Sequence, residues 1–241
     1  MSTLASDTAM IMAAGMGTRM RPLTDTQPKP LVRVADKPLI DHALDCLEEA
    51  GVTKAVVNVH YLADMLETHL AQRAVPAVTI SDERDMLLET GGGMIKAKPQ
   101  LPDPFFCLNA DNIWIDGRTN AFHELSRCWN PDVMDALLLL VPHSRAANFK
   151  GQGDFHMDGD GVLSRRVPDE TAPYIYTGIQ LVSHHLMRDA PEGKFSTNVF
   201  WSRAIEEGRL FGAVFNGQWF EVGTPEAIAP TELALERAHS E

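Results

Sequence analysis

Short apolar runs alternate with segments of helical periodicity along the first half of the chain. Apolar residues recur at helical spacing within 38–50 and within 61–73. Compact apolar runs at 8–14, 53–59 and 77–81 flank these two segments and predict buried strands. Strands that alternate with helices in this way build parallel sheets, so the pattern predicts an α/β fold with a doubly wound sheet.

The second half of the chain follows a less regular pattern. Residues 152–183 alternate around an Asp-Gly-Asp-Gly turn at 158–161, which predicts a β-hairpin and one further strand. The remaining elements are expected as strands at 104–108, 136–141 and 210–215 and as helices at 121–129, 198–207 and 225–237. No repeat or low-complexity linker interrupts the chain, so we expect a single domain over 1–241, with a first half of about 1–112 and a second of about 113–241.

Composition narrows the classes of partner. A chain of 241 residues that is 44% hydrophobic can bury one substantial core. Its net charge of −12 argues against nucleic acid and anionic membranes as partners, because both bind surfaces with an excess of Lys and Arg. Cys46, Cys107 and Cys128 are odd in number and lack metal-site spacing, so we expect no disulfide, no zinc site and a cytoplasmic location. The longest apolar run, 136–141, is too short to span a bilayer.

A glycine-containing loop with a local excess of cations follows the first expected strand. It reads AAGMGTRMRPLT over 13–24, and a Pro-Lys-Pro triplet follows at 28–30. Glycines let backbone N–H groups approach a polyphosphate, and Arg19, Arg21 and Lys29 add positive charge. The loop lacks the Lys-Ser or Lys-Thr of a Walker A motif and the third glycine of a dinucleotide fingerprint. It therefore predicts another kind of phosphate site at the carboxyl edge of the sheet; a plain glycine turn is the alternative.

This loop resembles the signature of the sugar-1-phosphate nucleotidyltransferases, GxGTRxxPLT followed by PKP. The resemblance continues through LETGGG at 88–93, LNAD at 108–111, YTGI at 176–179 and WFEVGTP at 219–225. The LETGGG block and the short chain are most similar to the N-acetylmuramate 1-phosphate uridylyltransferases of bacterial peptidoglycan recycling.

The resemblance implies a Rossmann-like, glycosyltransferase-A-like fold, with a mixed, mostly parallel sheet flanked by helices. It also implies transfer of a nucleoside monophosphate from an NTP, expected to be UTP, to a sugar 1-phosphate, expected to be N-acetylmuramate 1-phosphate. GTP with mannose 1-phosphate and dTTP with glucose 1-phosphate are alternatives within the same fold. A noncatalytic nucleotide-sugar sensor is the alternative from another class.

The same resemblance assigns nucleotide-binding residues. Arg19 is expected at the β- and γ-phosphates and Lys29 at the reacting phosphates, both as catalytic cations. Glu89 is expected to accept a hydrogen bond from uracil N3–H, or else to cap the helix that begins nearby. The full expected nucleotide-binding set is Ala13, Ala14, Gly15, Gly17, Thr18, Arg19, Lys29, Glu89 and Gly91.

Two acidic residues are the expected ligands of a Mg²⁺ cofactor. Asp111 directly follows a buried strand, where doubly wound folds place ligands, and the resemblance makes it a metal ligand. Glu221 stands where the relatives usually have aspartate as second ligand. A turn-forming aspartate and a solvated acid at a strand end are the alternatives.

The sugar is expected to contact Asn109, Gly153, Thr177 and Gly178 through hydroxyl and backbone groups. Where the relatives carry a lysine after a phenylalanine, this chain has Ser196, and Lys194 lies before the phenylalanine instead. Whether Lys194 takes over that contact is left open. The expected partners are an NTP and a sugar 1-phosphate, with no nucleic acid and no membrane, and the expected assembly is a monomer or a small homo-oligomer.

Overall fold

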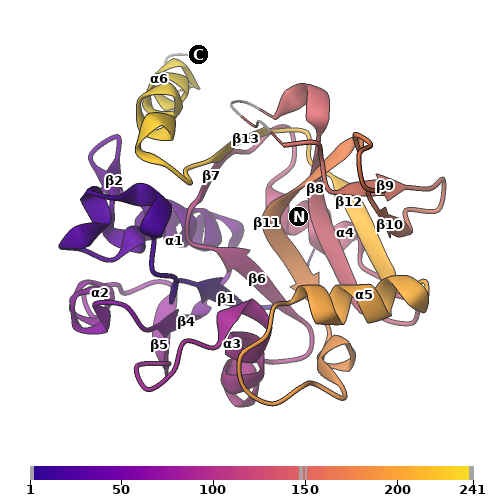
Figure 1. Cartoon of the computed structure of the whole chain (residues 1–241), viewed down its shortest axis with the longest axis horizontal. Helices are drawn as coiled ribbons and strands as arrows, with labels where there is room; N and C mark the ends of the chain where they lie inside the picture. Colours follow the sequence, from indigo (N-terminus) through magenta and orange to yellow (C-terminus); the bar gives the residue numbers. More distant parts are fainter. Residues whose placement is uncertain (1–2, 147–148, 150, 239–241) are drawn as a thin grey trace.

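The computed structural model describes residues 3–146, 149 and 151–238 and is built around a nine-stranded sheet (Figure 1). Residues 1–2, 147–148, 150 and 239–241 of the predicted domain lie outside this description. The nine strands are β1 (Thr8–Met12), β4 (Lys54–Val59), β5 (Ala77–Asp82), β6 (Phe105–Asn109), β8 (Ala136–Pro142), β9 (Phe155–Met157), β10 (Leu163–Arg165), β11 (Tyr174–Val182) and β12 (Leu210–Val214).

Two small sheets and six α-helices complete the described fold. The small sheets pair β2 (Arg33–Val34) with β3 (Lys37–Pro38) and β7 (Asn112–Ile115) with β13 (Gln218–Glu221). The helices are α1 (Leu39–Ala50), α2 (Ala63–Leu70), α3 (Glu89–Ala97), α4 (Ala121–Cys128), α5 (Asn198–Glu206) and α6 (Ile228–Ala238).

The large sheet is mixed, as expected. Strands β6, β1, β4 and β5 run parallel, and β8 and β12 form a second parallel pair. Strand β11 lies antiparallel between β6 and β8, and the β9–β10 hairpin extends the sheet beside β11. Both halves of the chain therefore contribute to one sheet, and the predicted Rossmann-like α/β fold is confirmed.

Alternate residues of each strand face opposite helical layers. Ala9 and Ile11 of β1 pack with α1, α2 and α4, whereas Met10 packs with α3 and α5. In Figure 1, α3 and α5 lie in front of the sheet, and α1 and α4 lie behind it. Helices cover both faces of the large sheet, so both sides of its strands are apolar. The strands therefore form continuous apolar runs that can be recognised in the sequence.

A third cluster lies under the basic loop, away from the main sheet. Met20 lies in the loop over 13–24, and Val32 directly precedes β2. Both pack with Ile113 of β7, Phe220 of β13 and Leu235 of α6. The apolar pattern predicted neither strand β7 nor the short β2–β3 pair. Strand β7 is four residues long and directly follows β6, so the apolar pattern alone does not separate the two.

Several elements are shorter than their patterns predict. The run 8–14 ends as a strand at Met12, because the N–H of Ala13 donates to the Asn58 side chain instead of a neighbouring strand. The helix expected over 61–73 begins at Ala63, after Leu62 adopts a left-handed φ of 49°. Within the described residues, no helix is both long enough and apolar enough to cross a membrane.

A buried carboxylate ties the amino end of β8 to the elements around it. The Asp135 side chain is 1% exposed and accepts hydrogen bonds from His185 Nδ1 (2.9 Å), Arg188 Nη1 (2.8 Å) and Arg209 Nε (2.6 Å). Burial alone raises the pKa of this carboxyl, but the hydrogen bonds from Arg209, His185 and Arg188 outweigh burial and hold the pKa of Asp135 below its ordinary value.

Asp135→Asn is expected to lower the free energy of unfolding by about 3 kcal/mol at neutral pH, since it removes the buried charge that pairs with Arg209 and Arg188. Arg188 keeps its second ion pair, with Glu207. The pKa of Asp135 is lower in the folded state than in the unfolded state, so its contribution is present above about pH 4 and is lost as pH falls through the folded pKa. Urea unfolding from pH 6 to pH 3 should show the gap between wild type and variant shrinking; a constant gap contradicts this account.

Candidate active site

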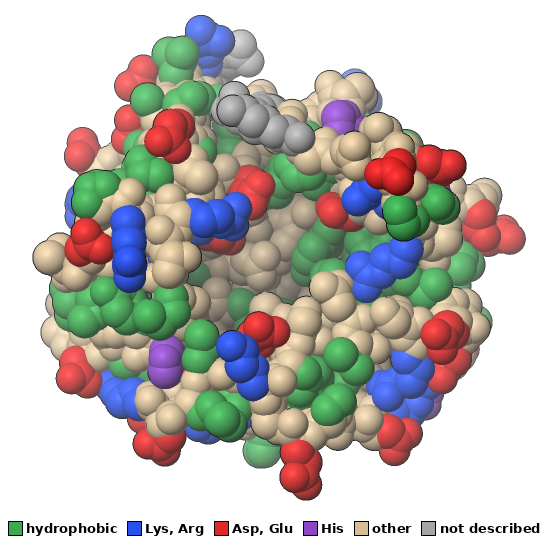
Figure 2. Space-filling model, in the orientation of Figure 1, with side chains coloured by type: hydrophobic (Ala, Val, Ile, Leu, Met, Phe, Trp, Pro, Cys, Tyr) green, Lys and Arg blue, Asp and Glu red, His purple; other side chains and the backbone are tan. Residues whose placement is uncertain are grey.

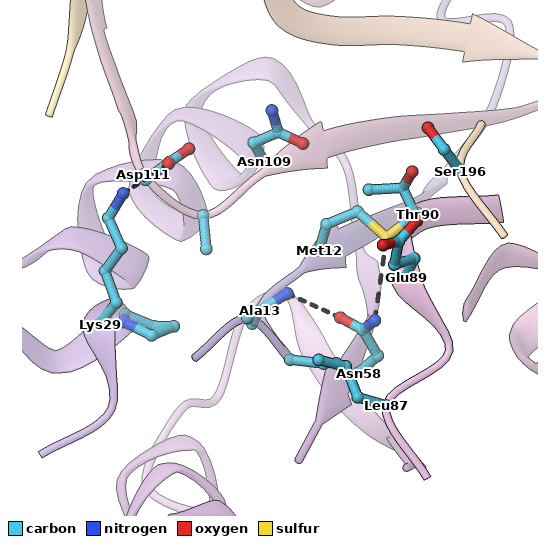
Figure 3. Close-up of a pocket in the computed structure, with 14 residues that line it drawn as sticks. Met12, Ala13, Lys29, Asn58, Leu87, Glu89, Thr90, Asn109, Asp111 and Ser196 are labelled. Carbon is cyan, nitrogen blue, oxygen red and sulfur yellow. Dashed lines mark hydrogen bonds and ion pairs between the residues drawn. The ribbon is translucent and has the colours of Figure 1, made fainter. Parts of the chain in front are cut away.

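A cavity of about 380 Å³ opens at the carboxyl ends of β1, β4 and β6. Figure 2 shows a hollow near the centre of the molecular surface that it draws. Figure 3 shows the residues that line the cavity. They are Met12, Ala13, Ala14, Gly15, Lys29, Pro30, Asn58, Leu87, Glu89, Thr90, Asn109, Ala110, Asp111 and Ser196. The first cavity thus joins the loop after β1 to the start of α3 and the end of β6.

A second cavity of about 260 Å³ adjoins the first one. Its walls are Arg19, Asn109, Asp111, Asn112, Phe149, Asp154, Ile175, Tyr176, Gly178, Trp219 and Glu221. Asn109 and Asp111 line both cavities. Ligands bound in the two cavities would therefore meet beside these two side chains.

A lysine and an aspartate form an ion pair where the cavities meet. Lys29 Nζ lies 2.6 Å from Asp111 Oδ2, and the two side chains are 12% and 25% exposed (Figure 3). Lys29 starts a short 3₁₀ turn between two prolines, which restricts its backbone. The ammonium group is therefore held in a fixed place at the carboxyl end of β6.

Gly17 allows the basic loop to pack against this lysine. Gly17 has a φ of +61°, and a Cβ at this position would lie 2.9 Å from Lys29 Cβ and 3.0 Å from Thr24 Cγ2. The Thr24 hydroxyl also donates to the Gly17 carbonyl at 2.8 Å. The glycine of the signature therefore supports Lys29, and it lines neither cavity itself.

The β7–β13 pair brings the two expected metal ligands together. Glu221 pairs with Asn112, and the N–H of Val222 donates to the Asp111 carbonyl at 3.1 Å. Arg19 Nη2 lies 3.7 Å from Glu221 Oε1, so Arg19 reaches the second cavity. In the part of the chain that the structure describes, no group of three or more His, Cys, Asp or Glu side chains is arranged to hold a metal ion. A cation here would have one or two carboxylates as protein ligands.

The expected nucleotide-binding residues fall into three groups. Ala13, Ala14, Gly15, Lys29 and Glu89 line the larger cavity. By contrast, Arg19 lines the smaller cavity, whereas Gly17, Thr18 and Gly91 line neither.

Glu89 occupies an unusual backbone position at the wall of the larger cavity. Its φ is +60°, a region that non-glycine residues seldom adopt and that often marks functional sites. No side-chain capping bond forms at the start of α3, so the structure does not support the capping alternative. The Glu89 carboxylate lies 3.8 Å from Lys194 Nζ, which places Lys194 beside this cavity.

The structure changes the interpretation of Gly91. Its N–H donates to the Phe195 carbonyl at 2.9 Å, and an added Cβ would lie 2.4 Å from the Phe195 ring. Gly91 does not line the cavity, so the close approach that this glycine permits is to Phe195. The expected contact between Gly91 and the nucleobase is not supported, because packing inside the protein already uses its N–H.

Thr177 and Gly153 also differ from expectation. Thr177 is fully buried, and its hydroxyl donates to the Leu139 carbonyl at 2.8 Å, so this hydroxyl is not presented to the cavity. Gly153 lies beside the cavity residue Asp154, but a Cβ on it would stand 2.2 Å from the Ala172 carbonyl oxygen. The close approach of the Ala172 backbone therefore explains why residue 153 is a glycine.

Gly178 and Asn109, which are expected to contact the sugar, lie close together in the structure. Both line the smaller cavity, and Gly178 lies in the irregular part of β11, where the register with β8 shifts between Tyr176 and Gln180. A Cβ on Gly178 would lie 2.0 Å from Asn112 Nδ2 and 2.9 Å from Asn109 Nδ2. The absence of a side chain at Gly178 therefore leaves room for these two amides.

Asn58, Asp154 and Ser196 line the cavities without an expected site role. Asn58 is an asparagine inside the apolar run 53–59, and that interruption was the available signal. Ser196 stands where the relatives carry a lysine, and that replacement was its signal. Asp154 carries no comparable signal.

Comparison with known proteins agrees with this geometry. Residues 8–151 match the family model described as nucleotidyl transferase. The chain is 42% identical to an N-acetylmuramate alpha-1-phosphate uridylyltransferase from Caulobacter vibrioides, over 95% of this chain and 97% of the relative. It is 35% identical to a protein of the same name from Neisseria meningitidis serogroup B, over 90% of this chain and 93% of the relative.

A solved structure supports the fold. A UDP-glucose pyrophosphorylase complexed with UDP-glucose superposes with a TM-score of 0.78, covering 97% of this chain and 99% of that one. The two sequences are 15% identical, so this match bears on the fold alone.

Gly178→Ala is expected to lower the free energy of unfolding by about 3 kcal/mol or more, because the new methyl group overlaps Asn112 and the backbone has a positive φ. Gly208→Ala is the matched control. Gly208 also has a positive φ, of +66°, but no atom lies within 4 Å of an added Cβ, so about 1 kcal/mol is expected. Equal losses in urea unfolding would contradict the proposed crowding around Gly178.

Proposed function

The chain belongs to the nucleotidyl transferase family, and on that premise we propose that it transfers a uridylyl group from UTP to N-acetylmuramate α-1-phosphate. The products are UDP-N-acetylmuramate and pyrophosphate. Such an activity fits peptidoglycan recycling in the cytoplasm, where nucleoside triphosphates are available.

One observation carries the reaction class. Two cavities share Asn109 and Asp111 as lining residues, and the Lys29 ammonium lies beside Asp111. A reaction between two phosphorylated substrates needs two adjoining sites and a cation between them, since the reacting groups repel each other. The choice of UTP and N-acetylmuramate 1-phosphate rests on the two relatives, which align over most of their length.

The mechanism is a single displacement at the α-phosphorus of the triphosphate. An oxygen of the sugar phosphate attacks this phosphorus, a new P–O bond forms, and the bond to the β-phosphate oxygen breaks to release pyrophosphate. The attacking oxygen is already anionic, so no side-chain nucleophile or general base is needed. The enzyme's task is to align the two anions and to neutralise charge that develops on the leaving group.

Lys29 and Arg19 supply that charge in this proposal. Lys29 lines the larger cavity beside Asp111, where it would contact the phosphates that react. Arg19 is held by one long ion pair and its side chain is 65% exposed, so it can turn from Glu221 towards the β- and γ-phosphates at little cost.

The donor set at the cavity junction fits a Mg²⁺ ion. Asp111 already binds a cationic group there, the Lys29 ammonium, and Glu221 lies on the paired strand. Mg²⁺ favours one or two protein carboxylates together with water and substrate phosphates. When bound, the metal would neutralise phosphate charge; Asp111 and Glu221 would hold it.

The remaining contacts follow from which residues line each cavity. The nucleobase would lie against Ala13, Ala14 and Gly15, with Glu89 accepting a hydrogen bond from N3–H. The sugar would occupy the smaller cavity beside Asn109 and Gly178.

Pyrophosphate release across four NTPs and several sugar 1-phosphates tests the proposal. Turnover is expected with UTP and N-acetylmuramate α-1-phosphate at a kcat/KM at least tenfold above every other pair. Preference for GTP with mannose 1-phosphate would contradict the assigned substrates but would still be consistent with nucleotidyl transfer as the reaction class. Binding without turnover of any pair would point instead to a nucleotide-sugar sensor.

Lys29→Ala and Arg19→Ala are each expected to lower kcat/KM by about a hundredfold or more, as for loss of one preorganised cation at a phosphoryl centre. Arg21→Ala is the matched control, since Arg21 lies on the same loop, is exposed, and lines neither cavity. Steady-state kinetics with circular dichroism distinguishes the outcomes. Near wild-type turnover of a folded Lys29 or Arg19 variant contradicts its assigned role.

Turnover is expected to require Mg²⁺ and to stop in EDTA. Asp111→Asn should abolish activity and keep the fold, because an amide is a poor ligand for a hard cation and carries no charge. Glu221→Asp should retain measurable activity, whereas Glu221→Gln should lose most of it. Equal activity of wild type and Glu221→Gln at limiting Mg²⁺ would remove Glu221 from the ligand set.

A further inference from the structure

A fully buried carboxylate lies behind the wall of the larger cavity. Glu83 is 0% exposed and follows β5. Its Oε1 accepts a hydrogen bond from Asn58 Nδ2 at 2.8 Å, and its Oε2 accepts one from the Leu88 N–H at 3.1 Å. Within the described residues, Glu83 has no salt bridge, so its charge is balanced by two neutral donors.

Asn58 connects this carboxylate to the loop after β1. Its Oδ1 accepts a hydrogen bond from the Ala13 N–H at 2.6 Å, as Figure 3 shows. A carboxylate only accepts, so Glu83 fixes which end of the Asn58 amide points inward. The amide oxygen must then face Ala13. The result is a chain of hydrogen bonds from Leu88 through Glu83 and Asn58 to Ala13, which we name the Glu83–Asn58 relay.

The surrounding backbone is shaped around the relay. A Cβ on Gly93 of α3 would lie 2.8 Å from Glu83 Oε1 and 3.0 Å from Asn58 Nδ2. The Glu83 carbonyl also contacts His60 Nδ1 at 2.8 Å. The carboxylate is therefore held by hydrogen bonds from β4 and from the residue before α3, and Gly93 leaves room for it beside α3.

The relay joins two segments of the chain that line the larger cavity. Ala13 and Asn58 line one part of it, while Leu87 and Glu89, the neighbours of Leu88, line another. Burial of a carboxylate without a cation is costly, and a polar network of this kind specifies geometry more than it adds stability. The relay also takes the Ala13 N–H, which is then unavailable to a ligand.

We propose that Glu83 is a positioning residue that, through Asn58 and Leu88, fixes the loop after β1 relative to the segment before α3 and thereby controls affinity for the nucleobase and selection among bases. This inference rests on the proposed function, because it takes the occupant of the larger cavity to be a nucleotide. Glu83 lines neither cavity and acts through the residues it holds.

Glu83→Gln keeps the shape of the side chain but presents an amide N–H to either Leu88 or Asn58, so one bond of the relay is lost. The dissociation constant for the preferred Mg²⁺–NTP is expected to rise tenfold or more, and discrimination among the four NTPs to narrow at least fivefold. The KM for the sugar 1-phosphate and the kcat at saturating NTP should stay within about threefold of wild type.

Asp135→Asn is the matched control. It alters another buried carboxylate, at the amino end of β8, and Asp135 lines neither cavity. The Asp135→Asn variant should be less stable than wild type but bind every NTP with unchanged affinity. This result would distinguish a positioning role of Glu83 from an effect of general destabilisation.

Gly93→Ala provides a second variant that keeps every polar group of the relay. Alanine favours the helix, so folding is expected, while its methyl group displaces Glu83 and Asn58. It should also weaken NTP binding and narrow base selection, and it decides the question if Glu83→Gln does not fold.

Isothermal titration with each of the four Mg²⁺–NTPs distinguishes failure of this inference from failure of the proposed function. Wild type that binds no NTP overturns the proposed function. Wild type that binds an NTP, together with a folded Glu83→Gln or Gly93→Ala variant of unchanged affinity and base selection, overturns the role of Glu83 alone.

Discussion

The ion pair between Lys29 and Asp111 is the contact around which the site is built. It places one positive and one negative group 2.6 Å apart where two cavities meet, in a chain with a net charge of −12. An acidic protein repels phosphorylated ligands unless cations are concentrated locally. Lys29 provides such a cation without leaving Asp111 as an isolated, partly buried charge. In the proposed reaction, Lys29 would contact the substrate phosphates, and Asp111 would help to hold the metal that neutralises phosphate charge.

Three parts of the fold position this ion pair. The large sheet ends β1, β4 and β6 at one edge, which creates the floor of the larger cavity. The β7–β13 pair carries Glu221 back to Asp111, although 110 positions separate them in sequence. The cluster of Met20, Val32 and Leu235 supports the basic loop from below, so α6 stabilises a loop that lies far from it in the sequence.

Sequence predicted this arrangement where local chemistry was distinctive. The apolar runs located most strands of the large sheet, and the loop over 13–24 indicated the end of β1, where the structure has a cavity. Prediction failed where a residue's role depended on a distant partner. Gly91 and Thr177 lie in family motifs, yet their N–H and hydroxyl groups are used inside the protein by Phe195 and Leu139. Asp154 and the Glu83–Asn58 relay depend on tertiary contacts that no local pattern encodes.

The central claim is direct transfer between two substrates that meet at Lys29 and Asp111, with no covalent enzyme intermediate. The stereochemical course at the α-phosphorus tests it most directly. A UTP analogue with a chiral α-phosphorothioate of known configuration would be turned over with N-acetylmuramate α-1-phosphate, and the configuration of the product would be determined by phosphorus NMR. A single in-line displacement predicts inversion at phosphorus. Retention would require two successive displacements through a nucleotidylated side chain and would contradict the mechanism.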